Sequence, residues 1–220
     1  MYNINKVRDK MTKNIALIWD LDGTLLDSYD VIMGGLCSVC DEYHYPYDKD
    51  AMRQEIITYS VSHFLINMAE KTGIPYDTLH SHCSKYTRAR VDEIKAMSHA
   101  KELLEALNTK GIKNYVFTHR GVTTERVLKN VGLYDYFIEI ITSQSGFKRK
   151  PEPEAINYLV EKYGLDRDNT YYVGDRNIDI ECAYNAHIKS IMFLPESNVA
   201  SPNGKETFIV KDLLEIINHF

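Results

Sequence analysis

The sequence predicts an α/β protein: a parallel sheet with helices on both faces, together with an all-helical cap domain. Three observations lead to this fold class. From residue 98 onward, short apolar runs alternate with helical patterns. A wholly helical stretch of several tens of residues separates the first apolar run from the second. Polar residues also follow directly where several of the apolar runs end, and ligands bind at that edge of a parallel sheet.

The first predicted strand covers residues 15–19, an unbroken apolar run that stops at Asp20 and is followed by Asp22 and Gly23. Short apolar runs bounded by turn residues are typical of buried strands, and glycine permits a sharp turn. The two-residue spacing directs both carboxylates to one side of the chain. Two carboxylates this close raise each other's pKa unless a cation or a shared proton lies between them. The stretch therefore favours a metal site, although a capped turn is an equal alternative from these residues alone.

The segment after this turn is predicted to be helical throughout. Ser28 is a plausible N-cap for a helix over residues 29–43, and Pro46 ends that helix. Further helical patterns cover residues 50–71 and 77–95, with little strand character. We therefore predict two domains, a core formed by residues 1–26 plus 97–220 and a helical cap formed by residues 27–96.

The rest of the chain alternates between helices and strands. A helix over residues 98–110 ends at Gly111, a common C-terminal residue, and the strand 115–117 ends at Thr118. The remaining predicted strands cover residues 137–141, 171–173, 188–194 and 208–210. The remaining helices run from Thr123 or Thr124 to 131, over residues 154–163 and 213–219, and, after Asp175, through Tyr184. This alternation is typical of a parallel sheet buried on both faces.

The strand ends place a set of polar groups at one edge of the predicted sheet. The set is Asp20, Asp22, Thr118, Ser143, Lys150, Asp175 and Asp179. Carboxylate oxygens suit Mg²⁺, which commonly binds one or two carboxylates plus phosphate oxygens. A phosphate dianion would be repelled from such an acidic site without that ion and a lysine. A carboxylate left free can attack phosphorus, so the set indicates phosphoryl transfer.

Four motifs in this order resemble those of the haloacid-dehalogenase-like superfamily. They are DLDGT at 20–24, a hydrophobic strand ending in Thr118, Lys150 followed by PEP, and GDRNID at 174–179. The resemblance covers essentially the whole chain and implies a Rossmann-like core. The helical insertion resembles the cap of phosphoglycolate-phosphatase-like members.

The resemblance implies a role for each matching residue. Asp20 would be the nucleophile that forms a phosphoaspartate and also a magnesium ligand. Asp22 would act as general acid and then base, and its backbone carbonyl would bind the metal. True dehalogenases of this superfamily lack an acid at that position, so Asp22 favours a phosphatase. Asp175 would bind the metal, and Asp179 would do so directly or through water.

The phosphate would be held by Thr118 and Lys150, again by resemblance. Lys150 belongs to a basic run with Lys148 and Arg149, and the run alone does not establish which lysine points inward. The residue before a proline is held extended, which favours Lys150. His119 is predicted as a further phosphate contact. It and Arg120 follow Thr118 along the chain, although such residues on loops are more often solvated.

Composition narrows the partners and the compartment. The net charge of −5 argues against a nucleic-acid partner, and no apolar run approaches the ~18 residues of a membrane span. Residues 1–14 lack the apolar core of a signal peptide, so we expect a cytoplasmic protein that does not bind membranes. Its four cysteines are expected to be core thiols. The sequence does not indicate an oligomeric state.

The sequence thus predicts a magnesium-dependent phosphatase acting on a small phosphorylated metabolite. A sugar-phosphate mutase of the same fold is an alternative, but the distinctive cap residues that mutase-like members place soon after the first motif are not evident in residues 28–40. A receiver-like signalling module also collects acids, a hydroxyl and a lysine at a sheet edge, but it would be about half as long. A non-hydrolytic phosphate-binding module is the last alternative.

Overall fold

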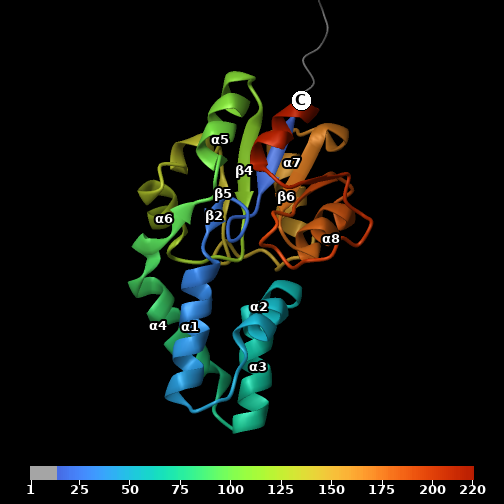
Figure 1. The fold of residues 1–220 in the computed structure, drawn as a ribbon. Helices are drawn as coiled ribbons and strands as arrows, with labels where there is room; N and C mark the ends of the chain where they lie inside the picture. The colour runs from blue at the N-terminus through green and yellow to red at the C-terminus, as the bar shows by residue number, and fades with distance from the viewer. Residues whose placement is uncertain (1–13) are drawn as a thin grey trace, which may run out of the picture.

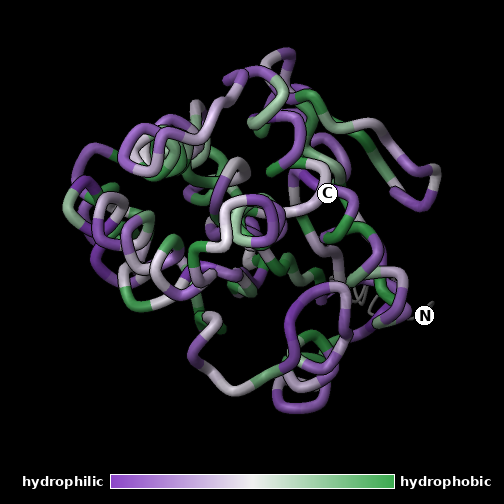
Figure 2. The backbone as a smooth tube through the Cα atoms, turned by 90° about the horizontal axis from the view of Figure 1, so that it is seen from below, coloured by the Kyte–Doolittle hydropathy of each residue, from purple (hydrophilic) through white to green (hydrophobic). Residues whose placement is uncertain are grey.

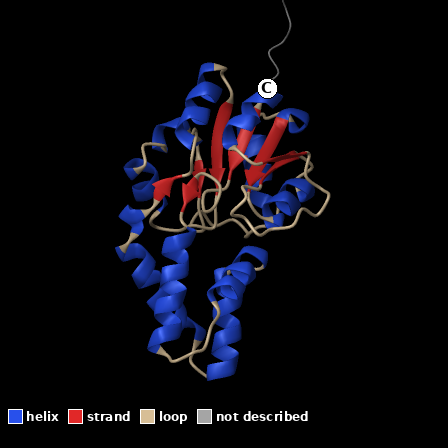
Figure 3. Cartoon of the chain, viewed as in Figure 1, coloured by secondary structure: helices blue, strands red, loops and turns tan. Residues whose placement is uncertain are grey.

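The computed structural model describes residues 14–220 and places six strands in one sheet, in the order β5-β4-β1-β6-β7-β8 (Figures 1 and 3). Every neighbouring pair is parallel. The strands are β1 (Ala16–Trp19), β4 (Lys113–Phe117), β5 (Ile140–Ile141), β6 (Thr170–Gly174), β7 (Lys189–Phe193) and β8 (Phe208–Val210). The chain runs outward from β1 to β5 and returns to the other side of β1 at β6. The strand order therefore reverses at β1, which is where ligands bind in such sheets.

Helices cover both faces of the sheet, which confirms the predicted Rossmann-like α/β fold class. On one face lie α5 (Ala100–Thr109), α6 (Thr124–Asn130) and η5 (Leu213–His219), and on the other lie α7 (Glu154–Tyr163) and α8 (Asn177–Asn185). Leu17 and Trp19 of β1 pack toward the first group, whereas Ala16 and Ile18 pack toward the second. Because both faces are buried, β1 is apolar at every position rather than alternating.

The insertion consists of four helices below the sheet in Figure 1. They are α1 (Tyr29–Glu42), α2 (Lys49–Thr58), α3 (Val61–Thr72) and α4 (Tyr76–Ala89), and they share a hydrophobic cluster of their own. The prediction of one helix over residues 50–71 was wrong, because the chain breaks at Tyr59 and Ser60. The Ser60 hydroxyl accepts a hydrogen bond from the His63 N–H at 2.9 Å and so begins a new helix. A continuous apolar pattern does not reveal such a break.

A short antiparallel ribbon lies where the chain enters and leaves this insertion. It pairs β2 (Leu26–Asp27) with β3 (Lys95–Ala96), and the 3-10 turn η2 (Val91–Glu93) precedes β3. The predicted helix over 77–95 was therefore wrong at its end, because a two-residue strand is too short to show a periodic pattern. The ribbon lies next to both predicted domain boundaries. The division itself stays a prediction, and its residues 1–13 lie outside the described part.

Several other predicted elements differ in detail. Ser28 precedes α1, but its hydroxyl makes no capping hydrogen bond and has no partner within residues 14–220. The strand predicted over residues 137–141 is formed only at Ile140–Ile141, after the 3-10 turn η3 (Tyr134–Tyr136). The last predicted helix is 3-10 rather than α. Local backbone geometry decides these features, and apolar periodicity does not report it.

Hydrophilic and hydrophobic residues are interspersed along the helices (Figure 2). This is typical of amphipathic helices that pack by one face. Within residues 14–220, no helix is both long enough and apolar enough to cross a lipid bilayer.

The cysteines are unpaired thiols. Cys40, Cys83 and Cys182 are buried within hydrophobic clusters, as expected, whereas Cys37 is half-buried at the edge of the helical cluster. Burial raises the pKa of Cys40, Cys83 and Cys182 to about 12 in each case, so these thiols stay protonated at neutral pH.

The only tryptophan of the chain, Trp19, is fully buried at the end of β1, immediately before Asp20. Its indole Nε1–H donates a hydrogen bond to Asn114 Oδ1 on β4 at 2.9 Å. The Asn114 amide in turn donates to the Ile112 carbonyl at 3.3 Å. This pair satisfies a polar group inside the apolar layer and joins β1 to β4.

We expect Asn114→Ala to lower the free energy of unfolding by about 2 kcal/mol, because it leaves the buried indole N–H unsatisfied and opens a small cavity. Denaturant unfolding followed by Trp19 fluorescence measures this change. Asn108→Ala, at an exposed position on α5, is the control and is expected to change stability by less than about 0.5 kcal/mol. A loss at Asn114 no larger than that of the control would contradict the role of this hydrogen bond.

Candidate active site

Three adjacent strands deliver polar residues to one edge of the sheet. Asp20 follows β1, Thr118 follows β4 and Asp175 follows β6, and β1 lies between the other two strands. Lys150 reaches the same place from the loop before α7, and Asp179 from the first turn of α8. A cavity of about 510 Å³ lies between this edge and the helical insertion. The sequence-predicted residues therefore converge.

Lys150 forms the centre of the cluster. Its Nζ lies 2.9 Å from Asp20 Oδ1 and 2.6 Å from Asp179 Oδ1, and its side chain is 2% exposed. Lys148 and Arg149 are exposed, so Lys150 is the member of the basic run that turns inward. Burial alone would lower the pKa of Lys150, but the attraction of Asp179 and Asp20 outweighs burial and raises it. Lys150 is therefore a permanent ammonium ion.

Asp175 joins the two carboxylates that contact this ammonium group and completes a cluster of three. Asp20, Asp175 and Asp179 each offer an oxygen within 4.8 Å of the others, and all three residues are buried. Burial, reinforced by Asp179 and Asp20, raises the pKa of Asp175 to about 8, and burial also raises the pKa of Asp179. The single positive charge of Lys150 does not neutralise the negative charge of three buried carboxylates. A hard divalent cation such as Mg²⁺ fits this all-oxygen donor set and would supply the missing positive charge.

Asp175 is held by residues from three separate segments. The Thr24 hydroxyl donates to its Oδ1 at 3.2 Å, the Tyr29 hydroxyl donates to its Oδ2 at 2.8 Å, and the Asn198 amide donates to its carbonyl oxygen at 3.1 Å. Gly23 lies against it with a positive φ of 83°, and a Cβ there would lie 2.4 Å from Asp175 Oδ2. Only glycine fits this turn. Sequence reasoning missed Tyr29 and Asn198, which no local pattern marks.

Asp22 has a different environment. Its carboxylate does not belong to the three-carboxylate cluster and instead pairs with Arg120, whose Nη2 lies 2.5 Å and Nε 3.0 Å from Oδ1. The Arg120 side chain is 10% exposed, and its Nη1 donates to the Thr123 hydroxyl at 3.1 Å. The sequence identified Arg120 only as a residue near the site. The structure shows that it makes a bidentate ion pair with the predicted general acid.

His119 and Thr118 shape the loop that follows β4. His119 Nε2 accepts a hydrogen bond from the backbone N–H of Lys150 at 2.9 Å, and the Thr118 hydroxyl accepts one from the Arg120 N–H at 3.2 Å. Burial, followed by the positive charges of Lys150 and Arg149, lowers the pKa of His119 to about 2. His119 is therefore neutral. Its predicted contact with phosphate stays a prediction, and its Nε2 is already used by Lys150.

Arg176 connects this edge of the sheet with the helical insertion. Its Nε donates to the Ile57 carbonyl at 2.9 Å and its Nη2 to the Tyr59 carbonyl at 2.5 Å. Both carbonyls lie at the end of α2, where the predicted long helix breaks. Because Arg176 directly follows Asp175, the insertion is bound next to the carboxylate cluster. Sequence reasoning assigned no role to this arginine, although it lies within the GDRNID motif.

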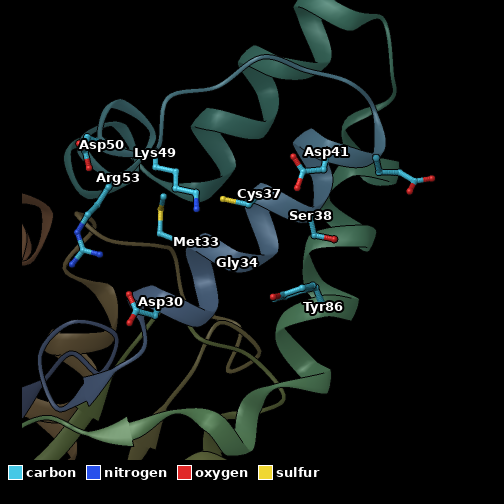
Figure 4. A pocket seen from close by; sticks show the side chains of 11 residues that line it. Asp30, Met33, Gly34, Cys37, Ser38, Asp41, Lys49, Asp50, Arg53 and Tyr86 are labelled. Atoms are coloured by element: carbon cyan, nitrogen blue, oxygen red, sulfur yellow. The ribbon is translucent and has the colours of Figure 1, made fainter.

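A second cavity, of about 790 Å³, lies within the helical insertion between α1, α2 and α4. Figure 4 shows its lining, with Asp30 and Asp41 on α1 and Lys49 and Arg53 on α2. None of the sequence-predicted site residues lines it. The smaller cavity at the sheet edge, which Asp20 lines, is therefore the candidate active site.

The central parallel sheet, the helical insertion after its first strand and the buried carboxylate–lysine cluster define a class of α/β proteins in which inserted helices cover an acidic site. A family model described as haloacid dehalogenase-like hydrolase matches residues 17–193. The chain belongs to that family.

Individual relatives agree with this assignment. The chain is 28% identical to a phosphoglycolate phosphatase of Aliivibrio fischeri over 211 residues, covering 87% of this chain and 89% of that protein. It is 29% identical to a putative pyrophosphatase of Caldanaerobacter subterraneus, covering 81% of each. A crystal structure of a predicted phosphoglycolate phosphatase from Haemophilus somnus superposes with a TM-score of 0.82 at 23% identity, covering 95% of this chain and 99% of that one. This last similarity shows the fold.

The lowered pKa of His119 predicts an acid sensitivity of folding. In the unfolded chain a histidine takes up a proton near pH 6.5, whereas folded His119 stays neutral down to about pH 2. Between these values the unfolded state binds more protons, so stability is lost as the pH falls below about 6.5, by ~1.4 kcal/mol per pH unit. His119→Gln keeps a hydrogen-bond acceptor without the titration. We expect the variant to lose about 2 kcal/mol less than wild type between about pH 6.5 and pH 5.

Denaturant unfolding at several pH values measures this difference. His80→Gln, at an exposed histidine on α4, is the control and is expected to follow the wild-type pH dependence. Parallel curves for wild type and His119→Gln would show that His119 is protonated in the folded state.

Proposed function

We propose that this chain is a magnesium-dependent phosphatase that hydrolyses a small phosphomonoester through a phosphoaspartyl intermediate on Asp20. One observation carries the proposal. Of the three clustered carboxylates, Asp20 alone also lines the cavity, so it is both part of the candidate metal centre and accessible to a substrate. The cavity volume of about 510 Å³ suits a small molecule. Relatives named as phosphatases support the same reaction class.

The proposed metal site consists of the carboxylates of Asp20, Asp175 and Asp179 and the backbone carbonyl of Asp22. Mg²⁺ bound there would neutralise the acidic cluster and allow a phosphate dianion to approach. Lys150 and the hydroxyl of Thr118 would bind phosphate oxygens, since both side chains line the cavity. Because Lys150 engages Asp20 Oδ1, the other oxygen, Oδ2, is left for attack on phosphorus.

The proposed reaction has two steps. In the first, a bond forms between Asp20 Oδ2 and phosphorus while the bond from phosphorus to the alcohol oxygen breaks, and Asp22 delivers a proton to that oxygen. In the second, Asp22 takes a proton from water, which attacks phosphorus and releases inorganic phosphate from Asp20. The Lys150 ammonium group stays in place and holds the carboxylate through both steps.

The first test of this proposal is phosphate release from a panel of small phosphomonoesters, including an aryl phosphate, with Mg²⁺ or with a chelator. We expect turnover with Mg²⁺ and its loss with chelator, because buried carboxylates need the cation before they admit a dianion. Release that persists in chelator would contradict the metal requirement. Stable phosphorylation of the folded protein without release would favour the signalling module or the non-hydrolytic phosphate-binding module.

Asp20→Asn is expected to reduce turnover by at least about a thousandfold, because the amide is a poor nucleophile and the phosphoaspartate cannot form. Circular dichroism is expected to show an unchanged fold. Asp168→Asn is the control. Asp168 is exposed in the turn before β6 and does not line the cavity, so this variant should keep wild-type turnover. Activity of Asp20→Asn within about tenfold of wild type would rule out the assigned nucleophile.

A further inference from the structure

The cavity is lined by an unusual number of guanidinium groups for a site built on carboxylates. The four arginines that line it are Arg88, Arg120, Arg149 and Arg176. Arg176 is occupied by two backbone carbonyls of α2. Arg88 and Arg149 are exposed, and within residues 14–220 neither has a carboxylate within 4.0 Å. Of the four, only Arg120 pairs with a residue assigned to the proposed reaction, the general acid Asp22.

The ion pair of Arg120 occupies both oxygens of the proposed general acid. Nε donates to Asp22 Oδ1 at 3.0 Å and to Oδ2 at 3.2 Å, and Nη2 donates to Oδ1 at 2.5 Å. Asp22 therefore faces Arg120 with its full carboxylate edge. To reach the oxygen of a leaving alcohol, it must give up at least part of this contact. In this arrangement the Arg120 guanidinium holds Asp22 away from the leaving oxygen. Releasing Asp22 without loss of hydrogen bonds requires another anion to take its place on the guanidinium.

Arg120 is anchored independently of Asp22. Its Nη1 donates to the Thr123 hydroxyl at 3.1 Å, and its backbone N–H donates to the Thr118 hydroxyl at 3.2 Å. Its side chain is 10% exposed, whereas that of Asp22 is 24% exposed. If the pair separates, Asp22 is therefore the partner that moves, and the fork of Arg120 stays aimed into the cavity.

We propose that the substrate carries a second anionic group, a carboxylate or a second phosphate, that replaces Asp22 on Arg120 and so frees Asp22 to take up a proton from solvent and deliver it to the leaving oxygen. This inference rests on the proposed phosphatase function. The planar fork of arginine matches carboxylate and phosphate equally well, so exchanging one anion for another loses no hydrogen bond. A substrate with an uncharged leaving group must break the pair without replacement. Arg120 is thus a specificity-determining residue that couples recognition to the release of Asp22.

The test compares substrates with and without a second anionic group, and the ratio within each pair is compared between the wild type and Arg120→Gln. Phosphoglycolate is paired with hydroxyethyl phosphate for the carboxylate, and pyrophosphate with methyl phosphate for the second phosphate. Phosphate release with Mg²⁺ gives kcat/KM for each member in the wild type and in Arg120→Gln. We expect the wild type to prefer the charged member of at least one pair by about 10-fold to 100-fold, the range expected for a charged hydrogen bond. The preferred pair distinguishes the two anions.

In Arg120→Gln we expect the preference to disappear, because kcat/KM changes in opposite directions for the two members of a pair. The value of kcat/KM for the charged member falls about 10-fold to 100-fold, and that for the uncharged member rises several-fold because Asp22 is no longer held. Arg120→Lys keeps the charge but loses the fork, so it should give an intermediate preference. An equal loss for both members in Arg120→Gln would overturn the inference and assign Arg120 the positioning of Asp22 alone.

Arg126→Gln is the matched control. Arg126 makes the same kind of bidentate pair with Asp92, through Nε and Nη2, at an exposed site outside the cavity. We expect it to keep the wild-type preference, which shows that loss of an arginine–aspartate pair is not sufficient. Equal wild-type rates for both members of each pair would overturn the exchange but leave the phosphatase standing. Release from no substrate by the folded wild type would overturn the phosphatase itself and, with it, the exchange.

Discussion

The buried ion pairs of Lys150 are the interaction on which the rest of the site depends. Its ammonium group joins Asp20, at the end of the first strand, to Asp179, in the first turn of α8. Charges taken out of water are costly unless paired with good geometry, and removing one partner leaves the others uncompensated. Lys150 therefore fixes three distant segments to one another. Because it balances only part of the charge of the cluster with Asp175, the same arrangement leaves negative charge that a bound cation would balance.

The surrounding contacts fix Lys150 and Asp175 in turn. His119 accepts the backbone N–H of Lys150, so the loop after β4 sets the position of the loop that carries the lysine. Tyr29 donates to Asp175 from α1, and Arg176 donates to two carbonyls at the end of α2. Consequently the helical insertion contacts one member of the carboxylate cluster, Asp175, and the residue that follows it, Arg176. A displacement of the insertion would disturb Asp175 directly, so the cover of the site and its acidic centre are mechanically linked.

The sequence was sufficient for the parts of this arrangement that depend on local pattern. Apolar runs ending in polar residues predicted that Asp20, Thr118 and Asp175 would meet at one sheet edge, because parallel strands align their ends. The same reasoning failed where the decisive partner lies far along the chain. Nothing near Tyr29 indicates that its hydroxyl reaches Asp175, and nothing near Arg176 indicates the carbonyls of α2. The break before α3 and the two-residue ribbon were missed because capping and short pairings leave no periodic signal.

Charge pairing also explains how a chain with a net charge of −5 can admit an anion. Two cations that line the cavity have an anionic partner from the protein: Lys150 pairs with Asp20, and Arg120 pairs with Asp22. These partners are the two carboxylates assigned to the chemistry. In the proposed mechanism, an incoming phosphate would share Lys150 with Asp20, and an anionic group bound by Arg120 would release Asp22. On this proposal, binding and activation would follow from the same exchange of anions, so only a ligand with charge in both places would engage Lys150 beside Asp20 and also free Asp22.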